Sequence, residues 1–226
     1  MNFGETDEQQ MIRELVRDFA ETVLAPTVEH RDQNQIPPSE EWQAFLEYGL
    51  HGITIPEAYG GSPIDDVSEA IIIEELARVD PSFAVMYCVH VGLCSMTIAL
   101  HGDEHQKSTF LPRLAAGEVG AYSLSEAGAG TDAAAMSCKA KLSDDGTHYI
   151  LNGEKMWISN SAEAGVFVVF AEQQQQQQAD AIDNEKEPNF GCHCRRQSII
   201  GIYGDNECAE QLARLRAHQR RVCSGI

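Results

Sequence analysis

Residues 121–132 have the sequence AYSLSEAGAGTD, and the character of the chain changes at this stretch. Residues 119–125 contain few helix formers and no helical stripe of apolar side chains, so we expect a strand. The strand leads into a loop with Gly128 and Gly130. Glycines there let main-chain N–H groups approach an anion closely, and the hydroxyl of Thr131 can donate to a phosphate. Taken alone, an ordinary surface loop is the simpler interpretation, because the third glycine of a dinucleotide fingerprint is absent.

A second notable stretch is residues 152–160, with the sequence NGEKMWISN. Trp157 offers a flat apolar face with a donor at its edge. Ser159 places a hydroxyl two residues further on, on the same side of an expected strand at residues 156–158. This pair suits a planar heteroaromatic ligand. The alternative interpretation is a core tryptophan in a hairpin.

The residues before this region predict helices. Thr6 and Gln9 form a capping-box pattern, an apolar stripe continues to Val23, and Pro26 ends the run. Further helices are expected after Ser39, which we expect to act as the cap, and over residues 67–78, 83–100 and 105–114. The run over residues 83–100 approaches the length of a membrane span. We interpret it instead as the central helix of a bundle, because it contains polar residues and has no basic flank.

The residues after this region predict short strands joined by tight turns. Residues 136–142 alternate between apolar and polar side chains, and residues 144–146 (DDG) are a hairpin signal. Apolar runs at residues 149–151 and 164–171 predict further strands. We therefore expect an α+β chain in which an all-α helical domain precedes an antiparallel β-barrel or sandwich.

Four segments follow from this organisation. Residues 1–118 are the expected helical domain and residues 119–172 the β-domain that carries both notable stretches. Residues 173–187 begin with a glutamine run and are expected to be a disordered insertion. Residues 188–226 are interpreted as a degraded remainder of the β-domain with a basic tail.

The composition excludes some functional classes. The 226 residues carry 35 acidic and 16 basic side chains, a formal charge of −19. Nucleic acid and anionic membrane surfaces are poor partners for such a chain, because both are bound mainly through Lys and Arg. An odd count of seven cysteines and an acidic N-terminus without an apolar core favour reduced thiols in a cytoplasmic protein. A zinc site is a weak alternative, because the spacing of its candidate ligands is irregular. These are Cys192, His193, Cys194, Cys208, His218 and Cys223.

Taken together, the two stretches resemble the two flavin-binding signatures of the acyl-CoA dehydrogenase family. Ala127 stands where the first signature more usually has proline. Residues 57–61 (EAYGG), 102–107 (GDEHQK) and 111–118 (LPRLAAGE) also match family patterns in the expected order. The resemblance runs over about residues 3–172. It implies an N-terminal α-domain, a middle β-domain, a C-terminal α-domain and bound FAD.

The resemblance also implies roles for individual residues. Those expected to bind the flavin ring or its pyrophosphate are Tyr122, Leu124, Ser125, Gly130, Thr131, Trp157, Ile158 and Ser159. Thr131 is also expected near the acyl-CoA. The family removes the α-proton of an acyl thioester with a carboxylate while the β-hydride passes to flavin, which gives a 2-enoyl-CoA.

The family's catalytic base lies in the C-terminal α-domain, and we expect this sequence to end before that domain. We therefore name no catalytic residue, and we interpret Glu126 as a residue that orders its loop. An electron-accepting flavoprotein is the expected partner, and family members commonly form homo-oligomers through the domain expected to be missing. The alternative functions are a non-catalytic relative that binds flavin or other proteins, and an acidic helical adaptor unrelated to flavin.

Overall fold

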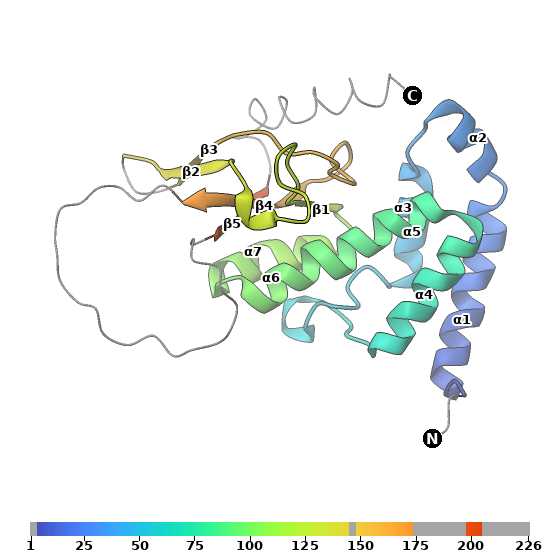
Figure 1. Ribbon diagram of the computed structural model, residues 1–226. Coiled ribbons are helices and arrows are strands. Elements are labelled where there is room, and N and C mark those ends of the chain that lie inside the picture. The colour runs from blue at the N-terminus through green and yellow to red at the C-terminus, as the bar shows by residue number, and fades with distance from the viewer. Residues whose placement is uncertain (1–3, 145–147, 174–197, 205–226) are drawn as a thin grey trace. The chain divides into compact units, whose positions relative to one another are not determined.

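The computed structural model describes residues 4–144, 148–173 and 198–204 (Figure 1). They divide into two compact units. The first contains residues 4–122, 159–168 and 203–204, and the second contains residues 123–144, 148–158, 169–173 and 198–202. Helices and strands both occur, so the α+β prediction is confirmed.

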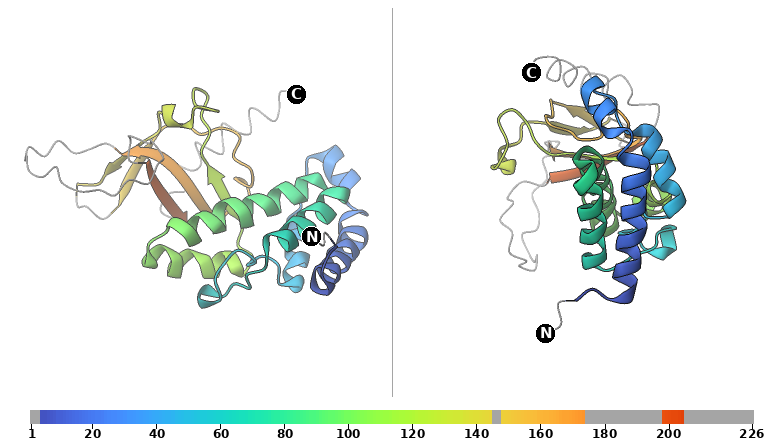
Figure 2. Two further views of the ribbon diagram at one scale, coloured as in Figure 1. Left: turned by 60° about the horizontal axis from the view of Figure 1, so that its bottom comes forward. Right: turned by 90° about the vertical axis from the view of Figure 1, so that its right-hand side faces the viewer.

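The first unit is built mainly from helices. The α-helices are α1 (Asp7–Phe19), α2 (Val28–Asn34), α3 (Ser39–Phe45), α4 (Asp66–Val79), α5 (Pro81–Cys88), α6 (Met96–His101) and α7 (Glu104–Ala115). Two π-helical segments, η1 (Ala20–Leu24) and η4 (Val89–Ser95), continue α1 and join α5 to α6. Short 3₁₀ turns lie at η2 (Leu46–Tyr48) and η3 (Glu57–Tyr59). Helix α4 packs against both α1 and α5, and α6 packs against α7 (Figure 2).

Local signals account for most helix starts. Thr6 and Gln9 make both bonds of the expected capping box at α1. Asp65 caps α4, and Asp80 caps α5. Ser39 was expected to cap α3, but it is the first helical residue, and its hydroxyl donates instead to Glu163 at 2.9 Å. Helix α2 was not predicted, because it is short and has no apolar stripe.

The most apolar helix spans residues 81–101. It is the one helix within the described ranges that is long and apolar enough to cross a membrane by length and composition. More than half of its apolar window, 56%, is buried inside the protein, as in the core helix of a bundle. Its buried side chains include Phe83 and Tyr87, which pack around Phe45 with ring centroids 5.6 and 5.5 Å away.

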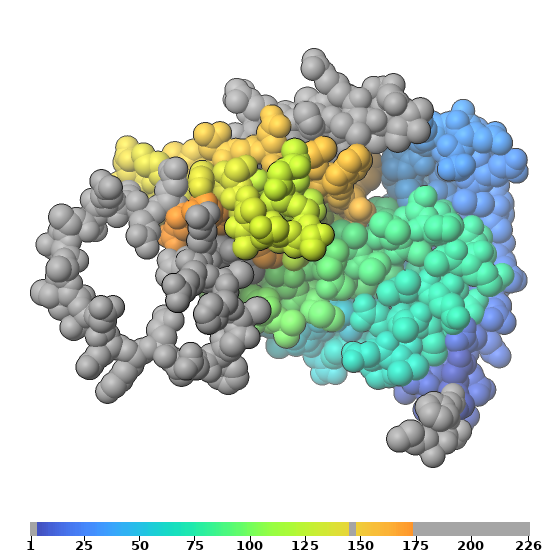
Figure 3. Space-filling view, viewed as in Figure 1, coloured from blue at the N-terminus to red at the C-terminus, as the bar shows by residue number. Residues whose placement is uncertain are grey.

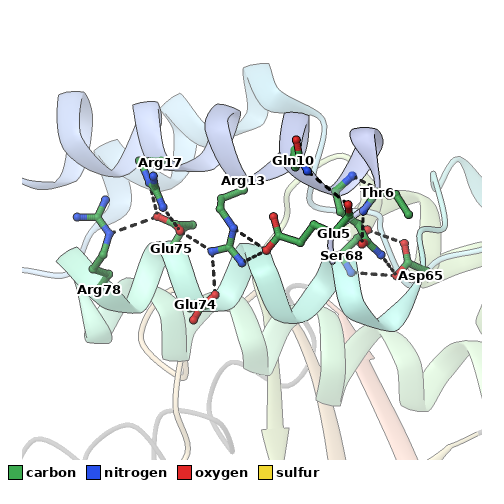
Figure 4. A network of polar contacts seen from close by, with 11 residues as sticks. Glu5, Thr6, Gln10, Arg13, Arg17, Asp65, Ser68, Glu74, Glu75 and Arg78 are labelled. Carbon is green, nitrogen blue, oxygen red and sulfur yellow. Dashed lines mark hydrogen bonds and ion pairs between the residues drawn. The ribbon is translucent and has the colours of Figure 1, made fainter. Parts of the chain in front are cut away.

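A network of charged side chains joins α1 to α4 (Figure 4). The Glu75 carboxylate is 2% exposed and accepts hydrogen bonds from Arg13 at 2.6 Å and Arg17 at 2.8 and 3.0 Å. Arg78 adds a longer bond of 3.3 Å. Glu74, on the same helix, is 67% exposed and is bonded to Arg13 at 2.8 Å. The buried carboxylate is therefore the centre of the network, and Glu74 lies at its edge.

Two buried histidines link the helices to the first strand, β1 (Gly120–Ser123). His90 donates from Nε2 to the His51 carbonyl at 3.2 Å and accepts from the Gly120 N–H on Nδ1 at 3.1 Å. These bonds require the neutral ring, since a proton on Nδ1 would oppose the Gly120 N–H. The two ring nitrogens of His51 are buried without a hydrogen-bond partner. The histidines are therefore held uncharged inside the core.

The described strands form one mixed sheet. The strands after β1 are β2 (Lys139–Leu142), β3 (Tyr149–Asn152), β4 (Val166–Gln173) and β5 (Ser198–Gly204). The order is β1-β4-β2-β3, with β5 also paired to β4. Strands β2 and β3 are antiparallel, as the expected hairpin requires, but β2 is parallel to β4. The prediction of an antiparallel barrel or sandwich is therefore wrong for this part of the sheet, because residues 153–165 cross from β3 to the other side of β2, where β4 runs in the same direction as β2.

Strand β5 coincides with an apolar stretch inside the segment that we interpreted as a degraded remainder. The rest of that segment and nearly all of the expected glutamine-rich insertion lie outside the described residues. The expected strand at residues 156–158 is absent, since these residues form a loop.

Candidate functional site

The glycine loop that follows β1 is open on one side. Gly130 and Thr131 are exposed, and the segment faces the viewer as yellow-green atoms in the space-filling view (Figure 3). A Cβ atom added at Gly128 or Gly130 would meet nothing within 4 Å, and neither residue has a left-handed backbone conformation. The described part of the chain therefore gives no steric reason for glycine at either position. An approaching external group would give one.

Glu126 holds the base of this loop. Its backbone exchanges two hydrogen bonds with Ala129, each of 3.1 Å. Its buried carboxylate accepts from the Ser137 N–H at 2.6 Å, the Ser137 hydroxyl at 2.7 Å and the Cys138 N–H at 3.0 Å. Burial alone would raise the pKa of Glu126, but these bonds and the one from Lys155 lower it to about 2. The side chain is thus a fixed anion that orders the loop, which agrees with the role expected for it.

Lys155 lies in the second signature and connects it to the first. Its side chain is 1% exposed, and its ammonium group donates to the Glu126 carboxylate at 2.7 Å and to the Leu124 carbonyl at 2.9 Å. The next residue, Met156, donates its N–H to the Ser125 carbonyl at 2.8 Å. Three bonds therefore join residues 124–126 to residues 155–156. The sequence analysis did not identify Lys155, because a single lysine two residues before Trp157 gives no periodic signal of burial.

Trp157 is exposed and has an unusual backbone. Its side chain is 71% exposed, and its φ is 60°, a left-handed value uncommon for a large residue. The Met156 N–H bond on one side and the buried Ile158 on the other fix this conformation. Trp157 is therefore neither in a strand nor in the core, so the core interpretation is wrong. A large indole face is presented to the outside on a constrained backbone.

The remaining predicted residues have the following places. Leu124 and Ser125 lie half-buried in the second unit, with their carbonyl groups bound to residues 155 and 156. Tyr122 and Ser159 belong to the first unit and are half-buried. Burial raises the pKa of the Tyr122 hydroxyl. The described bonds thus bring residues 124–126 and 155–156 together in one unit, with Gly130 and Thr131 exposed further along its loop.

The metal and thiol predictions can be checked only in part. Within residues 4–144, 148–173 and 198–204, no three His, Cys, Asp or Glu side chains are grouped to hold a metal ion. The candidate zinc ligands Cys192, His193, Cys194, Cys208, His218 and Cys223 lie outside the described residues. Cys88, Cys94 and Cys138 are free thiols.

Two family models match the sequence. The model of the acyl-CoA dehydrogenase N-terminal domain matches residues 6–118, and that of the middle domain matches residues 121–208. The first of these alone covers half of the chain, and the second contains both signature segments. The chain therefore belongs to the acyl-CoA dehydrogenase family.

Curated relatives agree with this assignment. A probable acyl-CoA dehydrogenase of Bacillus subtilis is 43% identical over 168 residues, which are 74% of this chain and 28% of the relative. A short-chain-specific acyl-CoA dehydrogenase of Clostridium acetobutylicum is 40% identical over 172 residues, or 76% and 45% of the two chains. The chain thus spans less than half the length of these relatives.

Solved structures have the same fold. Butyryl-CoA dehydrogenase from Megasphaera elsdenii superimposes with a TM-score of 0.72 and 40% identity, covering 78% of this chain and 47% of that one. An acyl-CoA dehydrogenase from Bacillus anthracis in complex with FAD has a TM-score of 0.71 and 34% identity, with coverages of 92% and 39%. A chain in the structure described as the electron transferring flavoprotein of Acidaminococcus fermentans has a TM-score of 0.73 and 42% identity, with coverages of 77% and 46%.

Proposed function

We propose that this chain is the flavin-binding part of an acyl-CoA dehydrogenase that oxidises an acyl-CoA thioester to a 2-enoyl-CoA. The observation that carries the proposal is the bonding of the two signature segments to each other through Lys155 and Met156. Family membership and the FAD complex of the Bacillus anthracis relative support the same conclusion. FAD, when bound, supplies the hydride acceptor.

The chemical character of the described residues suits the binding of a flavin. The exposed Trp157 ring can cover one face of a planar heteroaromatic group, and the Ser125 hydroxyl can donate to its polar edge. The family resemblance assigns a second hydroxyl, that of Ser159, to the same ring. The open loop at Gly128 and Gly130 can admit a pyrophosphate to main-chain N–H groups, with Thr131 as an added donor. These residues bind and orient the cofactor, and Thr131 also lies near the acyl-CoA in this proposal.

No described carboxylate is assigned as the base that removes the α-proton. Glu126 is excluded from that role, because it is buried and bonded to Lys155, Ser137 and Cys138, with its pKa lowered to about 2. A proton acceptor must instead hold a pKa near the working pH and reach the substrate. We propose that an electron-accepting flavoprotein reoxidises the reduced cofactor, as the similarity to the Acidaminococcus fermentans structure suggests.

The test is the visible absorption spectrum of the purified chain, reconstituted with FAD and then given butyryl-CoA without oxygen. A flavin band that bleaches with butyryl-CoA supports both binding and dehydrogenation. A band that persists limits the function to cofactor binding. Absence of a band from folded protein supplied with FAD refutes the proposal.

The second candidate function is a relative that binds proteins without dehydrogenation. Its supporting observation is an apolar row along the helix over residues 81–101, where Val85, Leu93 and Leu100 are 52%, 40% and 67% exposed. Exposed apolar rows of this kind favour association with other chains. Sedimentation of the purified chain as a monomer at micromolar concentration would count against this candidate.

A further inference from the structure

Lys155 is unusual among the lysines that the structure describes, because its ammonium group is buried with two fixed acceptors. One acceptor is the Glu126 carboxylate, which also holds Ser137 and Cys138, and the other is the Leu124 carbonyl. A buried ion pair of this kind contributes little net stability, because desolvation of both charges offsets their attraction. The effect of this ion pair on the relative position of the two signature segments is therefore more informative about function than its effect on stability.

The bonds around Lys155 act on both signature segments at once. On one side they fix the carbonyl of residue 124 and the carboxylate at the base of the glycine loop. On the other side Lys155 is two residues before Trp157, whose left-handed backbone also depends on the bond from Met156 to Ser125. Removing the ammonium group therefore frees the glycine loop and the tryptophan relative to each other.

We propose that Lys155 is a positioning residue for the flavin, which fixes the tryptophan that covers the ring relative to the loop that receives the pyrophosphate. This inference rests on the proposed function. In this proposal Lys155 does not contact the flavin. It acts on the flavin indirectly, by holding the main chain of residues 124–126 and 156–157 in place.

The test compares three forms of the full 226-residue chain with the wild type. K155M removes the ammonium group and keeps most of the side-chain volume. K155M/E126Q removes both charges, so that no unpaired anion is left buried if the single variant fails to fold. K139M is the matched control, because Lys139 also pairs with a glutamate in this unit, Glu172, but its side chain is 38% exposed and its ion pair joins β2 to β4 instead of the two signature segments.

The first measurement needs no flavin. Hydrogen exchange of the wild type should protect the amides of Ala129 and Met156, which donate to Glu126 and Ser125. In K155M/E126Q we expect both amides to exchange at least tenfold faster, while amides of the β2–β3 hairpin keep their rates. K139M should leave the Ala129 and Met156 rates within twofold. Unchanged rates at both amides in the double variant would overturn the inference.

The second measurement separates positioning from general stability. We expect K155M/E126Q to bind FAD at least tenfold more weakly than the wild type and K139M to bind it within twofold. With saturating FAD, quenching of flavin fluorescence by the tryptophan should be weaker in the double variant, which a purely stabilising residue would not cause. Equal affinity and equal quenching at saturation would overturn the inference. If the wild type binds no FAD, the proposed function fails and hydrogen exchange alone decides whether Lys155 constrains the two segments.

Discussion

Replacing Glu75 with glutamine tests whether the buried carboxylate between α1 and α4 stabilises the helical unit. Hydrogen bonds from Arg17, and then from Arg13 and Arg78, outweigh burial and lower the pKa of Glu75 from 4.5 to about 2. One pKa unit corresponds to about 1.4 kcal/mol, so the upper limit is about 3 kcal/mol. Arg17 and Arg78 are 48% and 44% exposed, and solvent screening reduces the expected loss to about 1–2 kcal/mol.

The assay is urea unfolding followed by circular dichroism at 222 nm, at pH 7 and at several values down to pH 3. The folded-state pKa lies below the unfolded one, so the contribution of Glu75 is complete above pH 4.5 and is lost as the pH falls toward 2. E75Q should therefore differ most from the wild type at pH 7 and approach it at pH 3.

The control is E74Q, because Glu74 is 67% exposed and is bonded to Arg13 at the edge of the same network. We expect a loss of at most about 0.5 kcal/mol for this variant. A constant difference between E75Q and the wild type from pH 7 to pH 3 would refute the linkage argument. Equal losses in E75Q and E74Q would refute the importance of burial.

Two further predictions concern the buried histidine pair and a close backbone approach. Burial lowers the pKa of His51 to about 4, so the unfolded state binds its proton first and stability falls as the pH drops below about 6.5. Between pH 7 and pH 5, the free energy of unfolding should therefore fall by about 2 kcal/mol more in the wild type than in H51L. An equal fall in the two proteins would contradict this prediction. A Cβ at Gly153 would lie 2.6 Å from the Cys138 Cα, so G153A should cost about 1–3 kcal/mol in urea unfolding. G128A, whose Cβ meets nothing within 4 Å, should leave unfolding unchanged, and similar losses in the two variants would argue against the close approach.

Local signals predicted the helical unit well. The capping box at Thr6 and the apolar stripe that follows it describe the first turns of α1 correctly, since both depend on residues three or four apart. The continuation of α1 as a π-helix and the short polar helix α2 have no comparable local signal. The long apolar helix was expected as one element, and its π-helical middle was not.

The candidate site was predictable in composition but not in arrangement. A strand was expected at residues 156–158, because Trp157 and Ile158 have high strand propensity. A hydrogen bond between residues 31 positions apart, Met156 and Ser125, holds the loop conformation instead. Strand propensity is a property of individual residues and does not account for a hydrogen bond to a distant segment. The burial of Lys155 could not be predicted from the local sequence for the same reason, because it depends on acceptors in a distant segment.

The two tryptophans divide between the two units and differ greatly in exposure. Trp42 is 1% exposed and donates to the Gly117 carbonyl at 2.7 Å, whereas Trp157 is 71% exposed. An aqueous quencher such as iodide would therefore suppress the emission of Trp157 and leave that of Trp42. The native sequence thus supplies an intrinsic optical reporter for each unit, and the order in which the units unfold can be followed without an attached dye.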